Sequence, residues 1–177
     1  MRLLLLLFLG YVAYATLTKK GGALDLSSGH AHKAGHVSAA TPDRQRILRD
    51  VNRYRRQHGL SVLRYSETCQ DAAALQLDYN AAHDLHGHSN PQFATPHDRL
   101  REAGHTYGAY VQHWGENAFR YTLSRDPKHS ANWQVFHLYH VSPHHDKQML
   151  DPKATVFGTA SVIDADGVLY NVEVFAN

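Results

Sequence analysis

The sequence contains a single cysteine and no strong excess of either charge, and each of these shortages excludes a class of protein. Cys69 has no second cysteine to pair with, so no internal disulfide holds this fold together. Lys and Arg total 18 against 16 for Asp and Glu, whereas a dedicated nucleic-acid-binding protein needs a strongly basic surface. The chain also lacks a P-loop, a dinucleotide-binding fingerprint, a His-Glu-x-x-His pair and a Gly-x-Ser-x-Gly elbow. We therefore expect no nucleic acid as a partner.

The residues that are present indicate one folded domain with an unusual amount of histidine. The 177 residues are 43% hydrophobic and 19% charged, a composition that supports a packed core and excludes wholesale disorder. Histidine occurs 15 times. Because free imidazole takes up a proton just below neutral pH, the net charge of the protein should rise steeply as the pH falls.

The first 17 residues have the pattern of a secretory signal peptide. Arg2 precedes an apolar run that extends to Leu17, and the triplet Ala13-Tyr14-Ala15 predicts cleavage after residue 15. The run is shorter than the roughly 20 residues of a membrane-spanning helix, although two lysines at 19–20 leave an uncleaved anchor as the alternative. In either case we expect the domain to act outside the cytoplasm, secreted, extracellular or periplasmic. Export without a disulfide pair is typical of bacterial proteins.

Residues 16–40 are rich in Gly, Ser, Ala and His and show little hydrophobic periodicity. Such a composition buries too little apolar surface to offset the entropy of ordering the chain, which predicts a flexible linker. We interpret His30, His32 and His36 as part of a polar tether; a weak metal-collecting tract is the alternative.

Residues 41–177 are predicted to form a mixed domain of helices and strands. Thr41-Pro42-Asp43 has the residue types of a helix start, with Thr41 as the cap, and Gly59 those of a helix end. Further helices are expected at 66–83, where Cys69 is most simply a small core residue, at 95–103 and at 130–139. The alternating segments 156–163 and 168–175 flank a turn and predict a β-hairpin.

The first helix also carries four arginines on one face. We interpret this face as solvated, and a surface for anionic lipid or polymer is the alternative. These residues are Arg46, Arg49, Arg53 and Arg56.

Three polar clusters are flanked by turn residues, at 86–91, 114–118 and 142–146. They contain histidine and carboxylate side chains, which are ligands that a divalent cation such as zinc prefers. Nearly thirty residues separate one cluster from the next, so spacing alone does not predict that they meet in space.

In this order, the clusters resemble the CAP superfamily of cysteine-rich secretory, antigen 5 and pathogenesis-related 1 proteins (the SCP domain), and in particular its disulfide-free bacterial branch. The resemblance covers residues 41–177. Its matching elements are an opening helix at 47–55 followed by His58-Gly59-Leu60, a His-x-x-Pro element at 88–91, the stretch 95–100, Gly115-Glu116-Asn117, and a segment at 142–150 similar to Ser-Pro-Gly-His-Arg-x-Asn-Ile-Leu.

The resemblance implies an α+β fold, a three-layer α-β-α sandwich with a central antiparallel sheet. It further implies a cleft in which His88 and His145 are the ligands of a divalent cation such as zinc. Glu116 would hydrogen-bond to the histidines, balance their charge or hold a water. The residues expected to support the cleft are Asn117, Ser142 and His144.

The sequence departs from the family pattern at several places. His144 stands where relatives have glycine, Asp146 where they have arginine, and Tyr139 where many have tryptophan. The second glutamate of the eukaryotic tetrad has no clear equivalent, and its place falls near Ser142. A site with at most three protein ligands would be open and weak, unless His144, Asp146 or His113 joined it.

The resemblance implies a binding module for a lipid or sterol-like ligand, without evident catalysis. Two alternatives remain open at this point. The first is a metal-dependent hydrolase or protease in which Glu116 is the general base. The second is an interaction protein associated with a cell-surface or envelope component.

Overall fold

The computed structural model describes residues 40–104, 111–123 and 128–177. The expected signal peptide at 1–15 and almost all of the expected linker at 16–40 lie outside the described residues, as do the three histidines of that linker. Within the described part, no helix combines the length and the apolar character needed to cross a membrane.

The helices and strands follow one another in a mixed order along the chain. In sequence they are α2 (Arg44–Gln57), β1 (Arg64–Tyr65), α3 (Glu67–Ala82), α4 (Pro96–Gly104), β2 (Trp114–Thr122), α6 (Ala131–His140), α7 (Pro143–Met149), β3 (Val156–Ile163) and β4 (Val168–Ala176).

The strands form one sheet in the order β1-β3-β4-β2. The hairpin of β3 and β4 is confirmed, and β4 also pairs antiparallel with β2 along its whole length. β1 differs from the expected antiparallel arrangement because it joins the edge of β3 in parallel, over two residues only. All nine residues of β4 are buried, since this strand has a neighbour on each side and helices over both faces.

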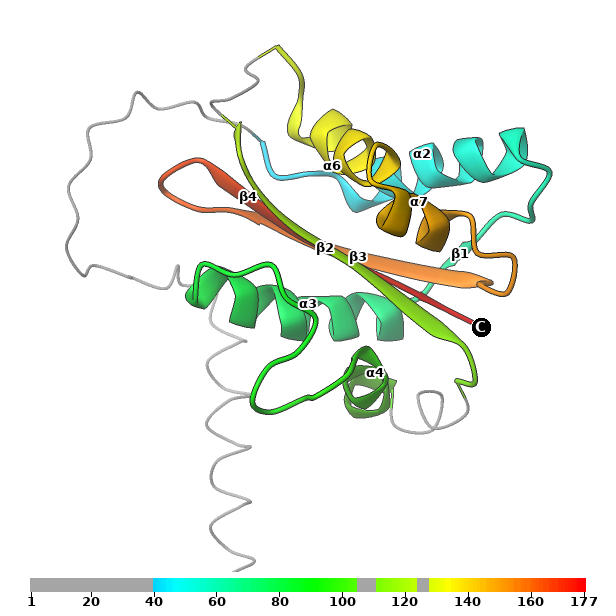
Figure 1. Ribbon diagram of the computed structural model, residues 1–177, viewed down its shortest axis with the longest axis horizontal. Helices are drawn as coiled ribbons and strands as arrows, with labels where there is room; N and C mark the ends of the chain where they lie inside the picture. Colours follow the sequence, from blue (N-terminus) through cyan, green and yellow to red (C-terminus); the bar gives the residue numbers. More distant parts are fainter. Residues whose placement is uncertain (1–39, 105–110, 124–127) are drawn as a thin grey trace, which may run out of the picture. The chain divides into compact units, whose positions relative to one another are not determined.

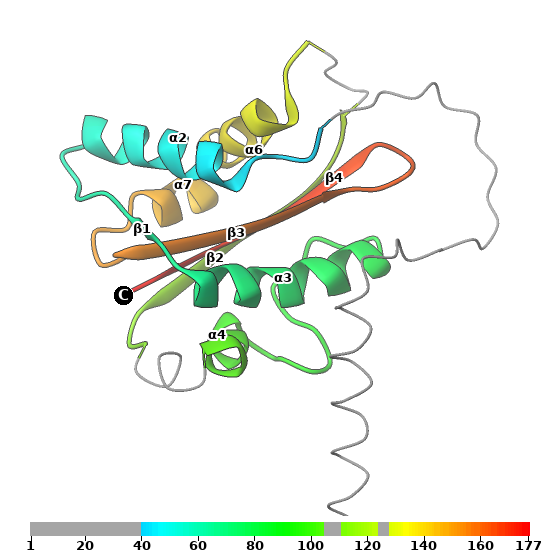
Figure 2. The ribbon, with the colours of Figure 1, turned by 180° about the vertical axis from the view of Figure 1, so that it is seen from behind.

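Helices cover both faces of the sheet, as Figures 1 and 2 show: α2, α6 and α7 lie on one face, α3 and α4 on the other. The three-layer sandwich is therefore confirmed. Successive residues of β4 alternate between the two layers. Leu169 and Phe175 pack in the core under α2 and α6, whereas Val172 and Val174 pack in the core against α3 and α4. Odd-numbered residues of β4 thus face α2, α6 and α7.

The first helix starts two residues later than expected. Its cap is Asp43 and not Thr41, because the Asp43 carboxylate accepts hydrogen bonds from the backbone N–H groups of Gln45 (2.8 Å) and Arg46 (3.3 Å). The end at Gly59 is confirmed by its positive φ of 71° directly after the cap residue His58. The helices expected at 66–83, 95–103 and 130–139 are confirmed to within one residue.

Arg55 differs from the four predicted surface arginines of α2 in its burial. The four arginines predicted to be solvated are exposed, whereas Arg55 is fully buried. Its guanidinium group ties α2 to the segments around it by donating to four backbone carbonyl groups. These belong to Ser61 (2.8 Å), Met149 (2.8 Å), Asp151 (2.9 Å) and Ala154 (3.3 Å).

Candidate functional site

Glu116 on β2 forms the centre of a buried polar cluster on the α3–α4 side of the sheet. One carboxylate oxygen bonds to Nδ1 of His88 at 3.0 Å and the other accepts from the guanidinium group of Arg99 at 2.5 Å. The side chains of Glu116 and Arg99 are 1% and 0% exposed, but that of His88 is 51% exposed. Arg99 also donates to the carbonyl group of His88 (3.2 Å). The buried ion pair therefore fixes both the ring and the backbone of His88, whose side chain is half-exposed.

The loop that carries His88 is held by two buried amides of α3. Gln76 and Asn80 both donate to the carbonyl group of Gly87, at 3.1 and 3.0 Å. Gln76 also donates to the carbonyl group of Ser89 (3.3 Å) and accepts from the amide of Asn90 (3.1 Å). Because these bonds fix the backbone on both sides of residue 88, the imidazole is presented by a rigid support.

Asn117, the next residue of β2, holds the second expected histidine from the opposite face of the sheet. Its Nδ2 donates to the carbonyl group of His145 on α7 (3.2 Å) and to Oε2 of Glu173 on β4 (3.4 Å). β2 pairs only with β4 among the described strands, so it is an edge strand of the sheet. Glu116 and Asn117 thus reach the two histidine segments on either side of one edge strand.

His145 is half-buried and favours the neutral form. Burial lowers its pKa from the ordinary 6.5, and the charges of His88, His144 and His86 lower this pKa further. The ring of Tyr139 lies edge-on to the His145 ring, with 5.1 Å between centroids. A neutral imidazole keeps a lone pair with which to bind a cation.

The remaining expected residues divide into those near the histidine pair and those paired elsewhere. Ser142 is the cap residue of α7 but its hydroxyl makes no capping hydrogen bond, and His144 is exposed on α7. Asp146 bonds to His140 (3.1 Å) and His113 bonds to Asp151. Asp146 and His113 therefore do not complete the site in this arrangement.

The donor set fits a two-histidine site. Both oxygens of Glu116 are engaged, so its carboxylate is a partner of His88 and is not a free ligand. No group of three or more His, Cys, Asp or Glu side chains is placed to hold a metal ion in the part of the chain that the structure describes. With its Nδ1–H donated to Glu116, His88 keeps the Nε2 lone pair for a cation, as in the carboxylate–histidine–zinc arrangement. Imidazole is a suitable ligand for zinc, and a site with only two protein ligands would hold the ion weakly.

Two buried charged residues of this region were not predicted. Arg99 is the ion-pair partner of Glu116. Glu173 is fully buried on β4, and burial raises its pKa from 4.5 to about 8, although the Asn117 hydrogen bond lowers it in part. An acid inside the apolar segment 168–176 is a signal that sequence inspection offers, whereas the Arg99 contact depends on tertiary packing.

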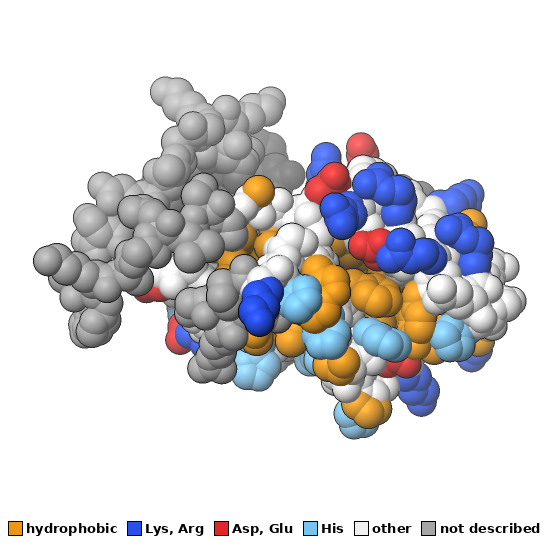
Figure 3. Space-filling view, turned by 90° about the horizontal axis from the view of Figure 1, so that it is seen from above, with side chains coloured by type: hydrophobic (Ala, Val, Ile, Leu, Met, Phe, Trp, Pro, Cys, Tyr) orange, Lys and Arg blue, Asp and Glu red, His pale blue; other side chains and the backbone are white. Residues whose placement is uncertain are grey.

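A second group of histidines, at and beside α6, packs against aromatic rings. The rings of His129 and His137 stack on the two sides of Trp133, at 3.6 and 4.1 Å between centroids, and His140 contacts Tyr54 and stacks on Phe136. Figure 3 shows histidine side chains among hydrophobic ones on this face, with arginines and lysines beside them. These three histidines are not among the residues expected to form the candidate site.

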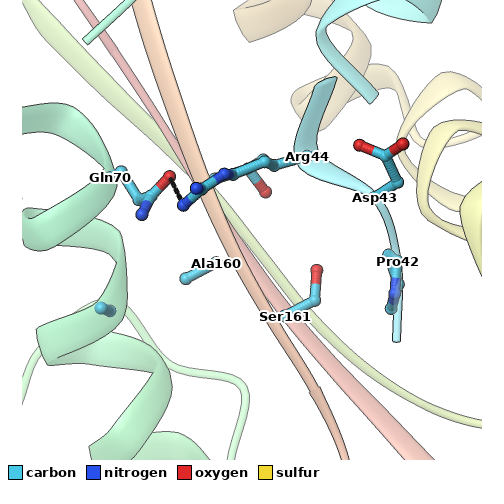
Figure 4. A pocket seen from close by; sticks show the side chains of 8 residues that line it. Pro42, Asp43, Arg44, Gln70, Ala160 and Ser161 are labelled. Atoms are coloured by element: carbon cyan, nitrogen blue, oxygen red, sulfur yellow. Dashed lines mark hydrogen bonds between the residues drawn. The ribbon is translucent and has the colours of Figure 1, made fainter. Parts of the chain in front are cut away.

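A separate hollow of about 420 Å³ lies beside β3. As Figure 4 shows, Arg44 of α2 and the preceding cap residue Asp43 line it on one side, Gln70 lines it from α3, and Ala160 and Ser161 from β3. Arg44 donates to the side-chain oxygen of Gln70 (2.8 Å) across it. None of the expected site residues lines this hollow.

Comparisons with known proteins agree with this architecture. The family model described as "CAP: Cysteine-rich secretory protein family" matches residues 48–175. Among solved structures, the chain is similar to an outer surface protein from Borrelia burgdorferi (TM-score 0.62, 15% identity, 78% of this chain and 98% of that chain). No curated protein matches the chain at a significant level.

Two further solved structures have the same fold. One is an extracellular protein containing an SCP domain from Bacillus anthracis str. Ames (TM-score 0.59, 21% identity, 76% of this chain and 40% of that chain). The other is a cysteine-rich secretory protein from Staphylococcus aureus subsp. aureus Mu50 (TM-score 0.52, 18% identity, 85% and 43%). The chain spans less than half the length of these two proteins. Because the family model matches most of the sequence, the chain belongs to the cysteine-rich secretory protein (CAP) family.

Proposed function

We propose that this protein is an extracytoplasmic binding module of the CAP family whose cleft holds a divalent cation, such as zinc, between His88 and His145. The observation that carries the proposal is the bond between His88 Nδ1 and Glu116 Oε1 (3.0 Å). It leaves Nε2 of a half-exposed imidazole free of that carboxylate, and His145 is near enough for the charge of His88 to lower its pKa. Imidazole nitrogen is a preferred ligand of zinc.

The residues around the histidines have distinct tasks in this proposal. Glu116 orients the His88 ring, Arg99 neutralises the buried carboxylate, and Asn117 fixes the backbone of His145. A bound zinc ion would supply a positive charge toward which an anionic ligand group is attracted. We extend the proposal to a small hydrophobic or lipid ligand. Its support is Trp114, which is 39% exposed and, two residues before Glu116 on β2, faces the same side of the sheet.

An extracytoplasmic location is supported by two independent features. The first 15 residues have the pattern of a signal peptide. The structural neighbours are described as outer-surface, extracellular and secretory proteins. The structure gives no support to the hydrolase alternative. Both carboxylate oxygens of Glu116 are hydrogen-bonded to protein groups, whereas a general base needs a carboxylate oxygen that can reach a water or a substrate.

A second candidate function is retention on an anionic envelope surface through α2. The exposure of Arg46, Arg49, Arg53 and Arg56 favours it. Binding to vesicles that contain phosphatidylglycerol should then weaken as salt is raised, and should be lost when the four arginines are changed to glutamine. Unchanged binding by that variant would reject this second function.

Zinc-dependent thermal unfolding tests the first proposal. Zinc should raise the midpoint of the wild type and of the control His83→Ala, because a ligand that binds the folded state stabilises it. His83 is exposed at the end of α3, outside the cleft. The double variant His88→Ala/His145→Ala should show no rise. An equal rise in that variant would show that zinc binds elsewhere.

A further inference from the structure

Asn117 and Glu173 form a cross-strand pair in the core of the domain. They are direct partners in the register of β2 and β4, and both side chains are fully buried. Asn117 Nδ2 donates to Oε2 of Glu173 (3.4 Å) and to the carbonyl group of His145 (3.2 Å). Both N–H groups of the Asn117 amide are thereby used.

The same pair leaves two buried acceptors without a donor. Among the described residues, neither Oδ1 of Asn117 nor Oε1 of Glu173 has a hydrogen-bond partner. Leaving a buried acceptor unpaired costs about 1–3 kcal/mol. Two such atoms on side chains that already share one hydrogen bond therefore require an explanation.

In the described part of the chain, Tyr139, Thr159 and the carbonyl group of His145 offer Glu173 neither a free hydroxyl donor nor a bonded counter-charge. From α6, the hydroxyl of Tyr139 donates to Asn171 (2.8 Å). From β3, the hydroxyl of Thr159 donates to the carbonyl group of Val172 (3.1 Å). α7 contributes the carbonyl group of His145, which is an acceptor.

Glu116 of β2 and Arg99 of α4 lie on the other side of the sheet, and neither has a hydrogen bond to Glu173. Glu116 carries a negative charge, and the guanidinium group of Arg99 bonds to it at 2.5 Å on the other side of the sheet. An ionised Glu173 would thus be a buried carboxylate with no cation bonded to it in the described part of the chain.

We propose that Glu173 is a neutral carboxylic acid whose Oε1–H donates to Oδ1 of Asn117, closing a cyclic acid–amide pair. One proton then satisfies both orphaned acceptors, while the existing Nδ2–H bond forms the other half of the ring. Every polar atom of the Asn117 amide has a partner in this arrangement. Because the same amide holds the carbonyl group of His145, Glu173 is a positioning residue for His145 of the candidate site.

Burial of Glu173 supports this assignment, because it raises the pKa of the carboxyl group to about 8, above neutral pH. The acid–amide pair itself does not depend on the proposed function. Only its consequence for cation binding rests on it. Ionisation would open the ring and leave two carboxylate oxygens facing the Asn117 amide, which should release the start of α7.

The test compares the wild type with Glu173→Gln in urea unfolding, without zinc. The glutamine amide presents an N–H donor and a carbonyl acceptor in place of the O–H and carbonyl of the acid, so it keeps the ring but has no proton to lose. A raised pKa in the folded state means that wild-type stability is complete below pH 4.5 and is lost as the pH rises toward 8. The ratio of the unfolding equilibrium constants, wild type over variant, should rise about a hundredfold between pH 5.5 and 7.5.

The variant Glu173→Met is the matched control, because it removes the ring and the charge together. It should be less stable than Glu173→Gln at every pH and should lack the wild-type pH dependence. An NMR titration supplies the positioning readout: the His145 backbone resonances should shift near pH 8 in the wild type but not in Glu173→Gln. The proposal is overturned if the hundredfold change is absent, or if glutamine is no more stable than methionine. Because zinc is omitted, either result leaves the proposed cation site to its own test.

Discussion

Glu116 and Asn117 are adjacent on β2, yet they bond to opposite helical layers. Glu116 pairs with Arg99 of α4 and with His88, whereas Asn117 donates to the carbonyl group of His145 at the start of α7. The alternation of side chains along a strand makes this possible with two consecutive residues. On an edge strand, this dipeptide fixes the segments that carry both histidines.

The buried Arg99–Glu116 ion pair should be essential for stability. Arg99→Met leaves the Glu116 carboxylate buried without its cation, and we expect the free energy of unfolding to fall by about 3–5 kcal/mol. Urea unfolding of the wild type and of Arg99→Met measures this fall in the free energy of unfolding. The control is Arg53→Met, since Arg53 is 64% exposed beside Asp50 and such a surface pair contributes at most about 1 kcal/mol. Equal losses in both variants would contradict the structural role assigned to Arg99.

Arg55 and Arg56 provide a matched pair of adjacent positions. Arg55 is buried and donates to four carbonyl groups, whereas Arg56 is exposed. Arg55→Met should lower the free energy of unfolding by about 3 kcal/mol, because several buried acceptors lose their partners. Arg56→Met should change it by less than about 0.5 kcal/mol. Denaturant unfolding of the two variants measures these changes. A loss of stability in Arg55→Met no larger than that in Arg56→Met would contradict the prediction.

At Gly158, β3 lies close against the backbone of α3. A Cβ atom added there would lie 2.1 Å from the backbone nitrogen of Gln70. The backbone of a packed helix cannot move to relieve such a clash as a flexible side chain can. Gly158→Ala should therefore destabilise the domain by about 3 kcal/mol. At Gly87, by contrast, an added Cβ meets nothing within 4 Å. Thermal unfolding should therefore show a large decrease in midpoint for Gly158→Ala and a small one for Gly87→Ala.

His145 should make the domain sensitive to acid. Its pKa is lower in the folded protein than the ordinary 6.5, chiefly because of burial. The unfolded chain therefore binds the proton more tightly, and the stability is present above pH 6.5 and is lost as the pH falls below it. Part of the fall in midpoint between pH 7 and 5 should vanish in His145→Gln and persist in His83→Gln. If both variants behave like the wild type, His145 does not titrate as the structure indicates.

Local patterns in the sequence were sufficient for most of the fold. Helical periodicity predicted α2, α3, α4 and α6, and alternation predicted the β3–β4 hairpin, because the apolar residues of these elements recur with the period of a helix or a strand. α7 was not predicted, since its seven residues bury only Met149 and carry no apolar stripe. β2 was recognised only as a polar cluster, because Glu116 and Asn117 are polar residues that the strand buries.

The candidate site depended more on the family resemblance than on spacing. His88, Glu116 and His145 are far apart in sequence, and no local pattern states that the chain brings them together. Arg99 lies within the stretch 95–100 that resembles the family, but its contact with Glu116 arises only when α4 packs on β2. Residue type alone indicates Thr41 as the cap, whereas the carboxylate of Asp43 reaches two backbone N–H groups.

The position of β4 in the sheet constrains how the domain folds during synthesis. β4 follows every other described element along the chain, yet it lies between β3 and β2 and pairs with both. The sheet therefore stays split until the last strand has emerged, and β2 waits with its inner edge unpaired while α6, α7 and β3 are made. Such long-range pairing is slow and leaves strand edges open to association with other chains. Under the proposed export, a chain of this topology benefits from crossing the membrane before it folds.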